Sequence, residues 1–307
     1  LNIKKLSKIE INLTKFDFNH WIMFESTKNL VFKYQIKKSI LTYENIAWEN
    51  MFILALKKYS PGTKIIGYQH TVVPKAAAGM FSNRHEIKLK PLPDKILTTG
   101  IINKKTILKF SDYKKNFVSS ACALRFQHLK KTRVKRRKKI KRILIVLEAN
   151  TEMKYLVNYL LLQVSNLQKL KFIIRPHPML SLANILKKTD YPIINNENVS
   201  ISSNSLLNDL KSSDLCIYWG STVSIEAIKM GIPIVHYRTN SILDYDPLYN
   251  FHHLKWTINY KSDLKKTIEK IDTIKSKYYK SLIGKSNIFL NKYFLKINNN
   301  NIKKFLN

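Results

Sequence analysis

The sequence predicts two α/β domains, each built on a sheet of parallel strands. Short, continuously apolar runs such as residues 143–147 alternate with longer amphipathic segments such as residues 48–58. This alternation is expected when helices cover both faces of a buried parallel sheet. The 307 residues are 45% hydrophobic, which is enough for one large core or two modest cores.

In the first domain, residues 1–127, a strand is expected at 39–43 and an amphipathic helix at 48–58. The Pro61-Gly62 pair marks a turn, and the next strand follows at 64–68. Further strands are expected at 94–97 and 117–124. Because the chain opens at Leu1 and not at a methionine, we expect that the first domain is truncated at its amino-terminal end.

A basic linker, residues 128–142, separates this domain from a second one at residues 143–285. The periodicity there predicts strands at 143–147, 171–174, 215–219 and 232–235, with helices at 152–167 and 205–211. From residue 262 onward the chain is rich in lysine and helical in pattern. The carboxyl-terminal segment, residues 286–307, is expected to end in a frayed, asparagine-rich tail.

The strand at 215–219 is followed by a turn that can hold an anion. Gly220 breaks the strand, and Ser221 and Thr222 stand where a helix begins. The first turn of a helix leaves backbone N–H groups unpaired, and two hydroxyls add donors, so a phosphate can bind there without a metal. Glu226 lies one helical turn later on the same face, where its carboxylate can accept hydrogen bonds from sugar hydroxyls. The alternative is an ordinary βαβ unit with a Ser/Thr cap.

A second polar loop follows the strand at 171–174. In the sequence Arg-Pro-His-Pro, two prolines stop the strand and fix Arg175 and His177 at its carboxyl end. Ligands of open α/β sheets bind at that edge. A lone histidine is often structural, but this loop belongs to the same sheet as the Gly-Ser-Thr turn. Together the two loops predict a clamp for a nucleotide phosphate.

These motifs resemble those of a known enzyme group. RPHP at residues 175–178, followed by GSTVSIEAIKMGIPIV at 220–235, resembles the nucleotide-binding half of GT-B glycosyltransferases of bacterial surface carbohydrate biosynthesis. The most similar are the sialyl- and polysialyltransferases, Kdo transferases and polyglycerolphosphate transferases. YENIAWEN at 43–50 and GYQHTVVP at 67–74 resemble the amino-terminal half of surface carbohydrate biosynthesis proteins. The resemblance implies two Rossmann-like domains and a last helix, near residues 286–294, that returns to the first domain.

The resemblance also implies roles for single residues. His177, Ser221 and Thr222 would bind the nucleotide of a CMP or CDP donor, and Glu226 would hold the ribose. The implied activity is transfer of a sugar, such as CMP-linked Kdo or another CMP-linked acidic sugar, to a surface polysaccharide or lipid-linked acceptor. Three alternatives stay open: a CDP-glycerol-type phosphotransferase, a nucleotide-sugar epimerase of the same fold, and a non-catalytic glycan assembly protein.

The first domain is expected to supply the acceptor site and the catalytic base. His70 follows the strand at 64–68, and a neutral imidazole can take a proton from an acceptor hydroxyl. Glu44 follows the strand at 39–43 and is the rival base, since burial near Trp48 would raise its pKa. His70 can instead brace its loop, and Glu44 can cap the helix that begins near residue 47. Glu86 and Glu148 are further alternatives.

No metal site and no cofactor are expected. Asp244 and Asp246 form an Asp-x-Asp pattern, but Pro247 after them favours a turn. The charge on the leaving phosphate would instead be stabilised by Arg175, His177 and the hydroxyls of the Gly220 turn. Two cysteines offer neither a disulfide framework nor a zinc site, so both are expected in the core; they are Cys122 and Cys216.

The formal charge of +34 comes mostly from lysines spread along the chain. Arginine, which reads phosphates and bases better, is scarce, and the sequence shows no nucleic-acid-binding motif, so no nucleic-acid partner is expected. The basic cluster at 128–142 is interpreted as a solvated linker, or else as a contact with anionic lipid headgroups or a charged glycan. No apolar run reaches the roughly 20 residues that cross a bilayer. A cytoplasmic protein is predicted, with peripheral membrane contact through 128–142 as the alternative.

Overall fold

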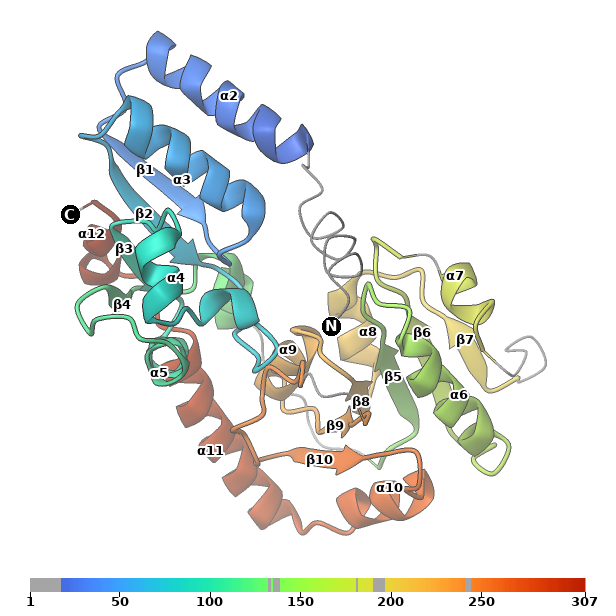
Figure 1. Cartoon of the computed structure of the whole chain (residues 1–307). Helices are drawn as coiled ribbons and strands as arrows, with labels where there is room; N and C mark the ends of the chain where they lie inside the picture. Colours follow the sequence, from blue (N-terminus) through green and yellow to red (C-terminus); the bar gives the residue numbers. More distant parts are fainter. Residues whose placement is uncertain are drawn as a thin grey trace.

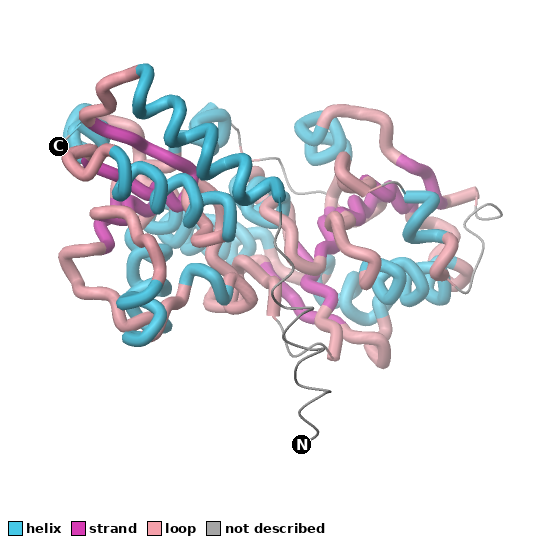
Figure 2. Tube along the Cα trace, turned by 45° about the horizontal axis from the view of Figure 1, so that its top comes forward, coloured by secondary structure: helices cyan, strands magenta, loops and turns pink. Residues whose placement is uncertain are grey.

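The computed structural model describes residues 18–131, 134, 139–180, 182–189, 197–240 and 244–306. The chain forms two α/β domains, each around its own parallel sheet (Figure 1). Figure 2 shows the two domains side by side, with helices packed around the strands of each. The predicted fold class is confirmed.

Domain one holds a four-stranded sheet in which every pairing is parallel. The carboxyl ends of its strands therefore share one edge. The strand order is β1-β2-β3-β4. Its elements are α2 (Phe18–Lys33), β1 (Lys38–Thr42), α3 (Ala47–Tyr59), β2 (Lys64–Gln69), η1 (Ala78–Met80), α4 (Arg84–Leu89), β3 (Lys95–Thr98), α5 (Ile101–Phe110), β4 (Val118–Ser120) and the 3₁₀ segment η2 (Leu124–Lys131).

Domain two holds a six-stranded parallel sheet. Its elements are β5 (Arg142–Val146), α6 (Met153–Val164), β6 (Lys171–Arg175), α7 (Leu182–Leu186), β7 (Val199–Ile201), α8 (Leu206–Ser212), β8 (Leu215–Tyr218), α9 (Val223–Lys229), β9 (Ile234–Tyr237), β10 (Lys255–Ile258) and α10 (Leu264–Asp272). The strand order is β10-β9-β8-β5-β6-β7. The chain builds outward from β5 to β7, then returns to pair β8 with β5, so the order reverses between β5 and β8. Ligands of open α/β sheets bind outside the carboxyl ends of the strands at such a point.

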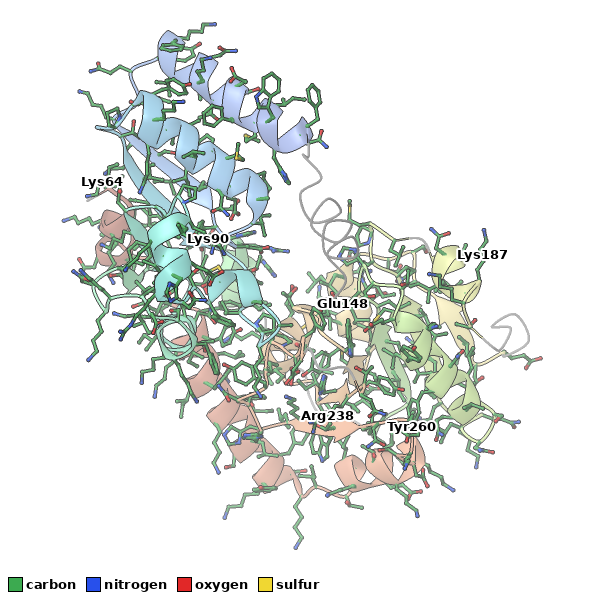
Figure 3. The ribbon with its side chains drawn as sticks, viewed as in Figure 1. Lys64, Lys90, Glu148, Lys187, Arg238 and Tyr260 are labelled. Atoms are coloured by element: carbon green, nitrogen blue, oxygen red, sulfur yellow. The ribbon has the colours of Figure 1, made fainter. Side chains whose placement is uncertain are left out.

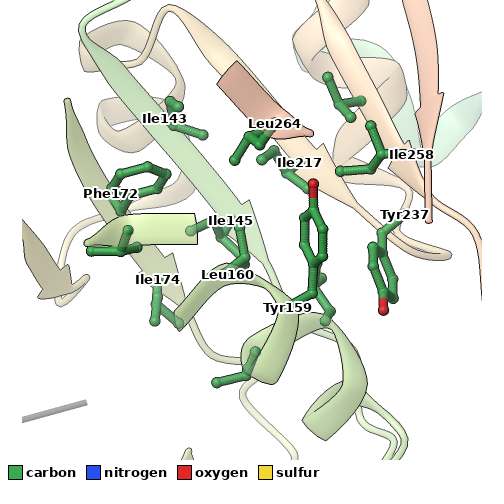
Figure 4. Packing of buried hydrophobic residues seen from close by; sticks show 14 of the residues in the cluster. Ile143, Ile145, Tyr159, Leu160, Phe172, Ile174, Ile217, Tyr237, Ile258 and Leu264 are labelled. Atoms are coloured by element: carbon green, nitrogen blue, oxygen red, sulfur yellow. The ribbon is translucent and has the colours of Figure 1, made fainter. Parts of the chain in front are cut away.

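Both faces of sheet two are covered, which explains why its central strands are apolar along their whole length. On one face α6 packs against the strands, with Tyr159 and Leu160 beside Ile145 and Ile217 (Figure 4). On the other face lies α9, whose apolar side chains share a second buried cluster with Ile234. Domain one contributes to this second cluster through its partly buried residues Val72 and Ile102.

Two carboxyl-terminal helices, α11 (Ser276–Tyr293) and α12 (Asn299–Leu306), connect the domains. The helix α11 contacts α9 in domain two and α5 in domain one. After it, Leu295 donates its N–H to the Thr99 carbonyl (2.9 Å) and accepts from Ala123 (3.1 Å). A Cβ at Gly100 would clash with the carbonyl of Tyr293, so this close approach requires glycine. The predicted return of the last long helix to domain one is observed, with a start at Ser276 and not near residue 286.

Several expected elements differ from the structure. The tail is not frayed: α12 docks on domain one, where Phe305 is buried and its ring centroid lies 5.2 Å from that of Tyr68. The strand expected at 117–124 ends at Ser120, because beyond it Leu124 donates its N–H to the Tyr68 hydroxyl. The short edge strands β7 and β10 were not predicted, since their half-exposed residues lack a continuous apolar pattern.

Both cysteines are buried and neither forms a disulfide, as the sequence predicts. Among the helices of the described residues, none combines the length and the apolar composition that crossing a membrane requires.

Candidate functional site

Three polar side chains meet where the strand order of sheet two reverses. The last residue of β5 pairs with the last residues of β6 and β8. Two positions further along these three strands lie Glu148, His177 and Gly220. The Ser221 hydroxyl and the His177 ring are both near enough to the Glu148 carboxylate to lower its pKa. Figure 3 shows Glu148 on the side of domain two that faces domain one.

The carboxyl group of Glu148 is largely buried, and its surroundings perturb it. Burial raises its pKa, and this outweighs the opposing effects of the Ser221 hydrogen bond and of the His177 charge. Its Oε1 atom is buried and has no hydrogen-bond partner among the described residues. Sequence reasoning named Glu148 only as an alternative base. Its position directly after the first strand of domain two was the signal that it lies at the same sheet edge as His177 and Ser221.

The turn after β8 and the start of the next helix form as the sequence predicts, but the first-turn N–H groups that were expected to be unpaired have local acceptors: Val223 and Ser224 donate to Ser221, and Ile225 donates to Thr222. The helix α9 begins at Val223, whose N–H donates to the Ser221 hydroxyl (3.3 Å), and Thr222 occupies the preceding cap position. A Cβ at Gly220 would lie 2.9 Å from the Cβ of Tyr245. Glycine is therefore required for the 244–246 segment to pass over the turn. Ser221 is almost fully buried, whereas Thr222 is half-buried.

His177 has one ring nitrogen engaged locally. Its Nδ1 accepts a hydrogen bond from the Met179 N–H at 3.2 Å. In the neutral imidazole the proton therefore resides on Nε2, which becomes a hydrogen-bond donor. The half-buried ring at the carboxyl end of β6 can thus donate to a phosphate oxygen.

Arg175, predicted to bind the nucleotide, forms a structural ion pair. Its guanidinium lies 2.7 Å from the fully buried carboxylate of Asp209 and donates to the Asn204 carbonyl at 2.8 Å. Ser202 donates to the same Asp209 oxygen at 2.6 Å. These contacts anchor β6 to α8. A direct role of Arg175 in nucleotide binding stays a prediction.

Glu226 lies on α9, one turn beyond Thr222, as expected. Its carboxylate is 3.1 Å from Nε2 of His128, a residue of η2 at the end of domain one. The Glu226 side chain is 15% exposed and that of His128 is 54% exposed. The carboxylate predicted to hold a ribose is thus accessible and has an interdomain partner that the sequence did not reveal.

The two base candidates of domain one lie at adjacent strand ends. Thr71, directly after His70, donates from its hydroxyl to Glu44 Oε1 at 2.9 Å. Burial lowers the pKa of His70; the Glu44 carboxylate opposes this shift and the Arg125 guanidinium adds to it. The Nδ1 atom of His70 is buried without a partner among the described residues. His70 is therefore neutral near pH 7 and can accept a proton.

Two other glutamates of domain one have structural roles. The helix α3 begins at Ala47, as predicted, but Glu49 and not Glu44 caps it: its carboxylate accepts the N–H groups of Glu44 (2.9 Å) and Ile46 (3.1 Å). Glu86 caps α4 and pairs with Lys90 at 2.8 Å. The alternative that Glu44 only caps α3 is therefore excluded, because Glu49 fills that role.

The Asp-x-Asp pattern forms a buried network. His236, Asp244 and Asp246 have oxygen or nitrogen atoms within 4.8 Å of one another, the spacing of a possible metal site. However, Asp246 pairs with the Lys255 ammonium and accepts hydrogen bonds from the Tyr218 hydroxyl (2.8 Å) and the Leu248 N–H (2.9 Å). A lysine cation inside the cluster and a saturated carboxylate do not fit a divalent ion.

Most of the basic cluster, residues 130–133 and 135–138, lies outside the described residues or has undescribed side chains. At its end the N–H groups of Lys141 and Arg142 donate to Asp214 (3.1 and 3.0 Å). Contact of this segment with an anionic surface stays a prediction.

The fold recurs in solved structures of low sequence identity. A UDP-GlcNAc 2-epimerase from Neisseria meningitidis bound to UDP-GlcNAc superposes with a TM-score of 0.59 at 12% identity, over 88% of this chain and 79% of that one. A glycosyltransferase from Rickettsia africae gives 0.59 at 15% identity, over 95% and 81%. The MnaA protein of S. aureus in complex with UDP gives 0.58 at 10% identity, over 86% and 72%.

No family model and no curated protein matches the sequence. At these identities the structural likeness establishes the fold alone. The chain therefore has the two-domain α/β fold that GT-B glycosyltransferases share with UDP-GlcNAc 2-epimerases.

Proposed function

We propose that this chain is a metal-independent glycosyltransferase that moves a sugar from a nucleotide donor to a surface polysaccharide or lipid-linked acceptor. The observation that carries the proposal is the meeting of Glu148, His177 and Ser221 where the strand order of sheet two reverses. Domain one adds a second pair of polar side chains, Glu44 and His70, at the carboxyl ends of β1 and β2.

In this mechanism negative charge develops on the nucleotide phosphate as the sugar leaves. The His177 Nε2–H and the hydroxyls of Ser221 and Thr222 would donate hydrogen bonds to that phosphate. Glu148, whose pKa is raised by burial, lies beside these donors at the end of β5. His70 would accept the proton of the acceptor hydroxyl as the hydroxyl oxygen attacks the sugar.

The donor is proposed to be a CMP-linked acidic sugar, on the basis of the RPHP and GSTVS motifs. The test is thermal unfolding with CMP, CDP, UDP or GDP, because a ligand at one hundred times its Kd stabilises by about 2.7 kcal/mol. We expect the greatest stabilisation with CMP, lost in His177→Ala and kept in His252→Ala, which alters an exposed histidine. Stabilisation by UDP alone would exclude the CMP donor, and equal protection of His177→Ala would exclude this phosphate site.

A nucleotide-sugar epimerase is the second candidate. It is favoured by the likeness to the N. meningitidis epimerase and by the presence of Glu148 and Glu44 at the strand ends. The two activities differ in their need for an acceptor. Conversion of UDP-GlcNAc to an isomer without acceptor would support the epimerase, whereas acceptor-dependent release of free nucleotide would support the transferase.

A further inference from the structure

A recess of about 420 Å³ lies at the carboxyl ends of β9 and β10, beside the first turn of α6. Figure 3 shows Arg238 and Tyr260 at this end of sheet two, apart from Glu148. Nothing in the proposed transfer reaction uses the recess. It is lined by Glu152, Tyr155, Tyr237, Arg238, Asn240 and Tyr260, together with Thr239.

The recess belongs to the face of sheet two that lies away from domain one. Tyr237 is part of the buried cluster under α6, where its ring centroid lies 5.2 Å from that of Tyr159. Domain one, through Val72 and Ile102, packs on the cluster of the opposite face. One hydrogen bond joins the recess to the residue before the Gly220 turn: the Trp219 indole N–H donates to the Thr239 hydroxyl at 3.3 Å.

Two half-exposed tyrosines provide flat apolar surfaces at the rim. The exposed fraction is 49% for Tyr155 and 58% for Tyr260. Each ring has a lysine ammonium close to it: Lys154 lies 4.9 Å from the Tyr155 centroid and Lys261 lies 5.4 Å from the Tyr260 centroid. The face of an aromatic ring is electron-rich, so it attracts the weakly positive C–H groups of a pyranose ring as it attracts these cations.

The charges around the recess favour an anion. Among the lining residues Arg238 faces one carboxylate, that of Glu152, and the ammonium groups of Lys154 and Lys261 at the two rim tyrosines add positive charge around the recess. Within the described part of the chain, the Arg238 guanidinium has no ion pair or side-chain hydrogen bond, and the residue is exposed. A guanidinium binds a carboxylate through two parallel hydrogen bonds, whereas Asn240 and Glu152 suit sugar hydroxyls.

We propose that this recess is a second binding site, specific for an acidic saccharide, and separate from the nucleotide site. The tyrosines would stack on pyranose rings and Arg238 would bind a sugar carboxylate. Such a site would hold a glycan segment on domain two. The proposal does not depend on whether the chain transfers or epimerises a nucleotide sugar.

Trigalacturonic acid is a suitable probe, and maltotriose is its neutral counterpart of the same length. Calorimetric titration at physiological salt should show saturable binding of trigalacturonate and much weaker binding of maltotriose. Arg238→Gln should weaken trigalacturonate binding by about tenfold or more, because it removes a charge-assisted hydrogen-bond pair. Tyr260→Ala should also weaken it.

The controls are matched in exposure and charge. Tyr278→Ala alters a tyrosine that is 58% exposed, as Tyr260 is, and Lys187→Gln removes an exposed positive charge far from the recess (Figure 3); both should bind as wild type does. His177→Ala should lose nucleotide protection and retain trigalacturonate binding. The proposal would be overturned if trigalacturonate did not bind saturably or if maltotriose bound equally well. It would also be overturned if Lys187→Gln weakened trigalacturonate binding as much as Arg238→Gln does. Loss of trigalacturonate binding in His177→Ala, or its displacement by CMP, would show that the recess is not separate from the nucleotide site.

Discussion

The Nε2 atom of His128 and a carboxylate oxygen of Glu226 lie 3.1 Å apart and join the last segment of domain one to α9 of domain two. The same segment, η2, carries Arg125, whose charge contributes to the lowered pKa of His70. One short 3₁₀ segment therefore contacts Glu226, which is predicted to bind a ribose, and also influences His70, the candidate base. A ribose that binds Glu226 must share this carboxylate with His128 or displace the imidazole.

The first prediction concerns Glu226. Glu226→Gln should weaken CMP binding by about tenfold, since hydrogen bonds to a charged acceptor contribute about 1.5–3 kcal/mol. The loss should be smaller for 2′-deoxy-CMP, which lacks one of the ribose hydroxyls. His128→Asn frees the carboxylate and should leave CMP binding unchanged or tighter. Calorimetric titration with CMP and 2′-deoxy-CMP measures these affinities. An equal loss of affinity for the two nucleotides would show that Glu226 does not bind the ribose 2′-hydroxyl.

Arg175 allows a test that separates stability from binding. Arg175→Ala would leave the carboxylate of Asp209 buried and unpaired, so the free energy of unfolding should fall by about 3–5 kcal/mol. Arg175→Ala combined with Asp209→Asn should recover much of it. Urea unfolding measures both, with Lys187→Ala as a surface control expected to stay within about 0.5 kcal/mol of wild type. A stable Arg175→Ala variant without CMP binding would instead support the nucleotide role predicted from the sequence.

The sequence predicted the central strands of domain two well, because strands buried on both faces are apolar along their whole length. β8 is of this kind, and β5 is apolar and buried after its first residue, Arg142. The Gly220 turn was also predictable, since glycine interrupts the apolar strand and the hydroxyl residues after it favour the start of a helix. The edge strands β7 and β10 and the docking of α12 were not predicted, because each depends on a distant segment. β7 pairs with β6, β10 pairs with β9, and α12 packs on Tyr68.

The candidate site was predictable only in part. Strand ends could be located, so His177, His70 and Glu44 could be placed at the edges of their sheets from the sequence alone. The sequence does not show which strands pair with each other. Glu148 was therefore not assigned to this cluster, because the register of β5 with β6 and β8 is what brings it to His177 and Ser221. The ion pair of Arg175 could not be predicted for a similar reason: its partner Asp209 lies on a different element and has no signature in the sequence.

Activity is expected to persist in EDTA. The best-placed metal-ligating group, at His236, Asp244 and Asp246, contains the Lys255 ammonium as the partner of Asp246. Transfer from the donor should therefore proceed at an unchanged rate after chelation. Complete loss that magnesium or manganese restores would contradict this and would assign Asp244 and Asp246 to a metal.

Glu148 should make stability depend on pH. Its pKa is raised in the folded state, so from the unfolded value near 4.3 up to the folded value the folded protein binds more protons. Its contribution to the free energy of unfolding therefore falls as the pH rises through this window. Glu148→Gln removes the effect, so the variant should match wild type near pH 4 and become relatively more stable toward pH 8. Urea unfolding across this range measures it, and parallel curves would show that burial of Glu148 has no such consequence.

The last prediction separates the two base candidates. His70→Ala should lower kcat by about a hundredfold or more, the usual scale for loss of a general base, and leave CMP affinity nearly intact. Because burial and Arg125 lower the pKa of His70, the acid limb of the wild-type kcat/KM profile should have its midpoint below the ordinary value near 6.5. That limb should disappear in the variant.

Glu44→Gln is the matched comparison, since it keeps the side chain's size and its contact with Thr71 while removing its basicity. If Glu44 only tunes His70, this variant should retain most of the turnover. Its acid limb should shift to still lower pH, because the Glu44 carboxylate raises the pKa of His70. An active His70→Ala and an inactive Glu44→Gln, both with intact CMP binding, would make Glu44 the base and leave His70 as a residue that braces the loop after β2.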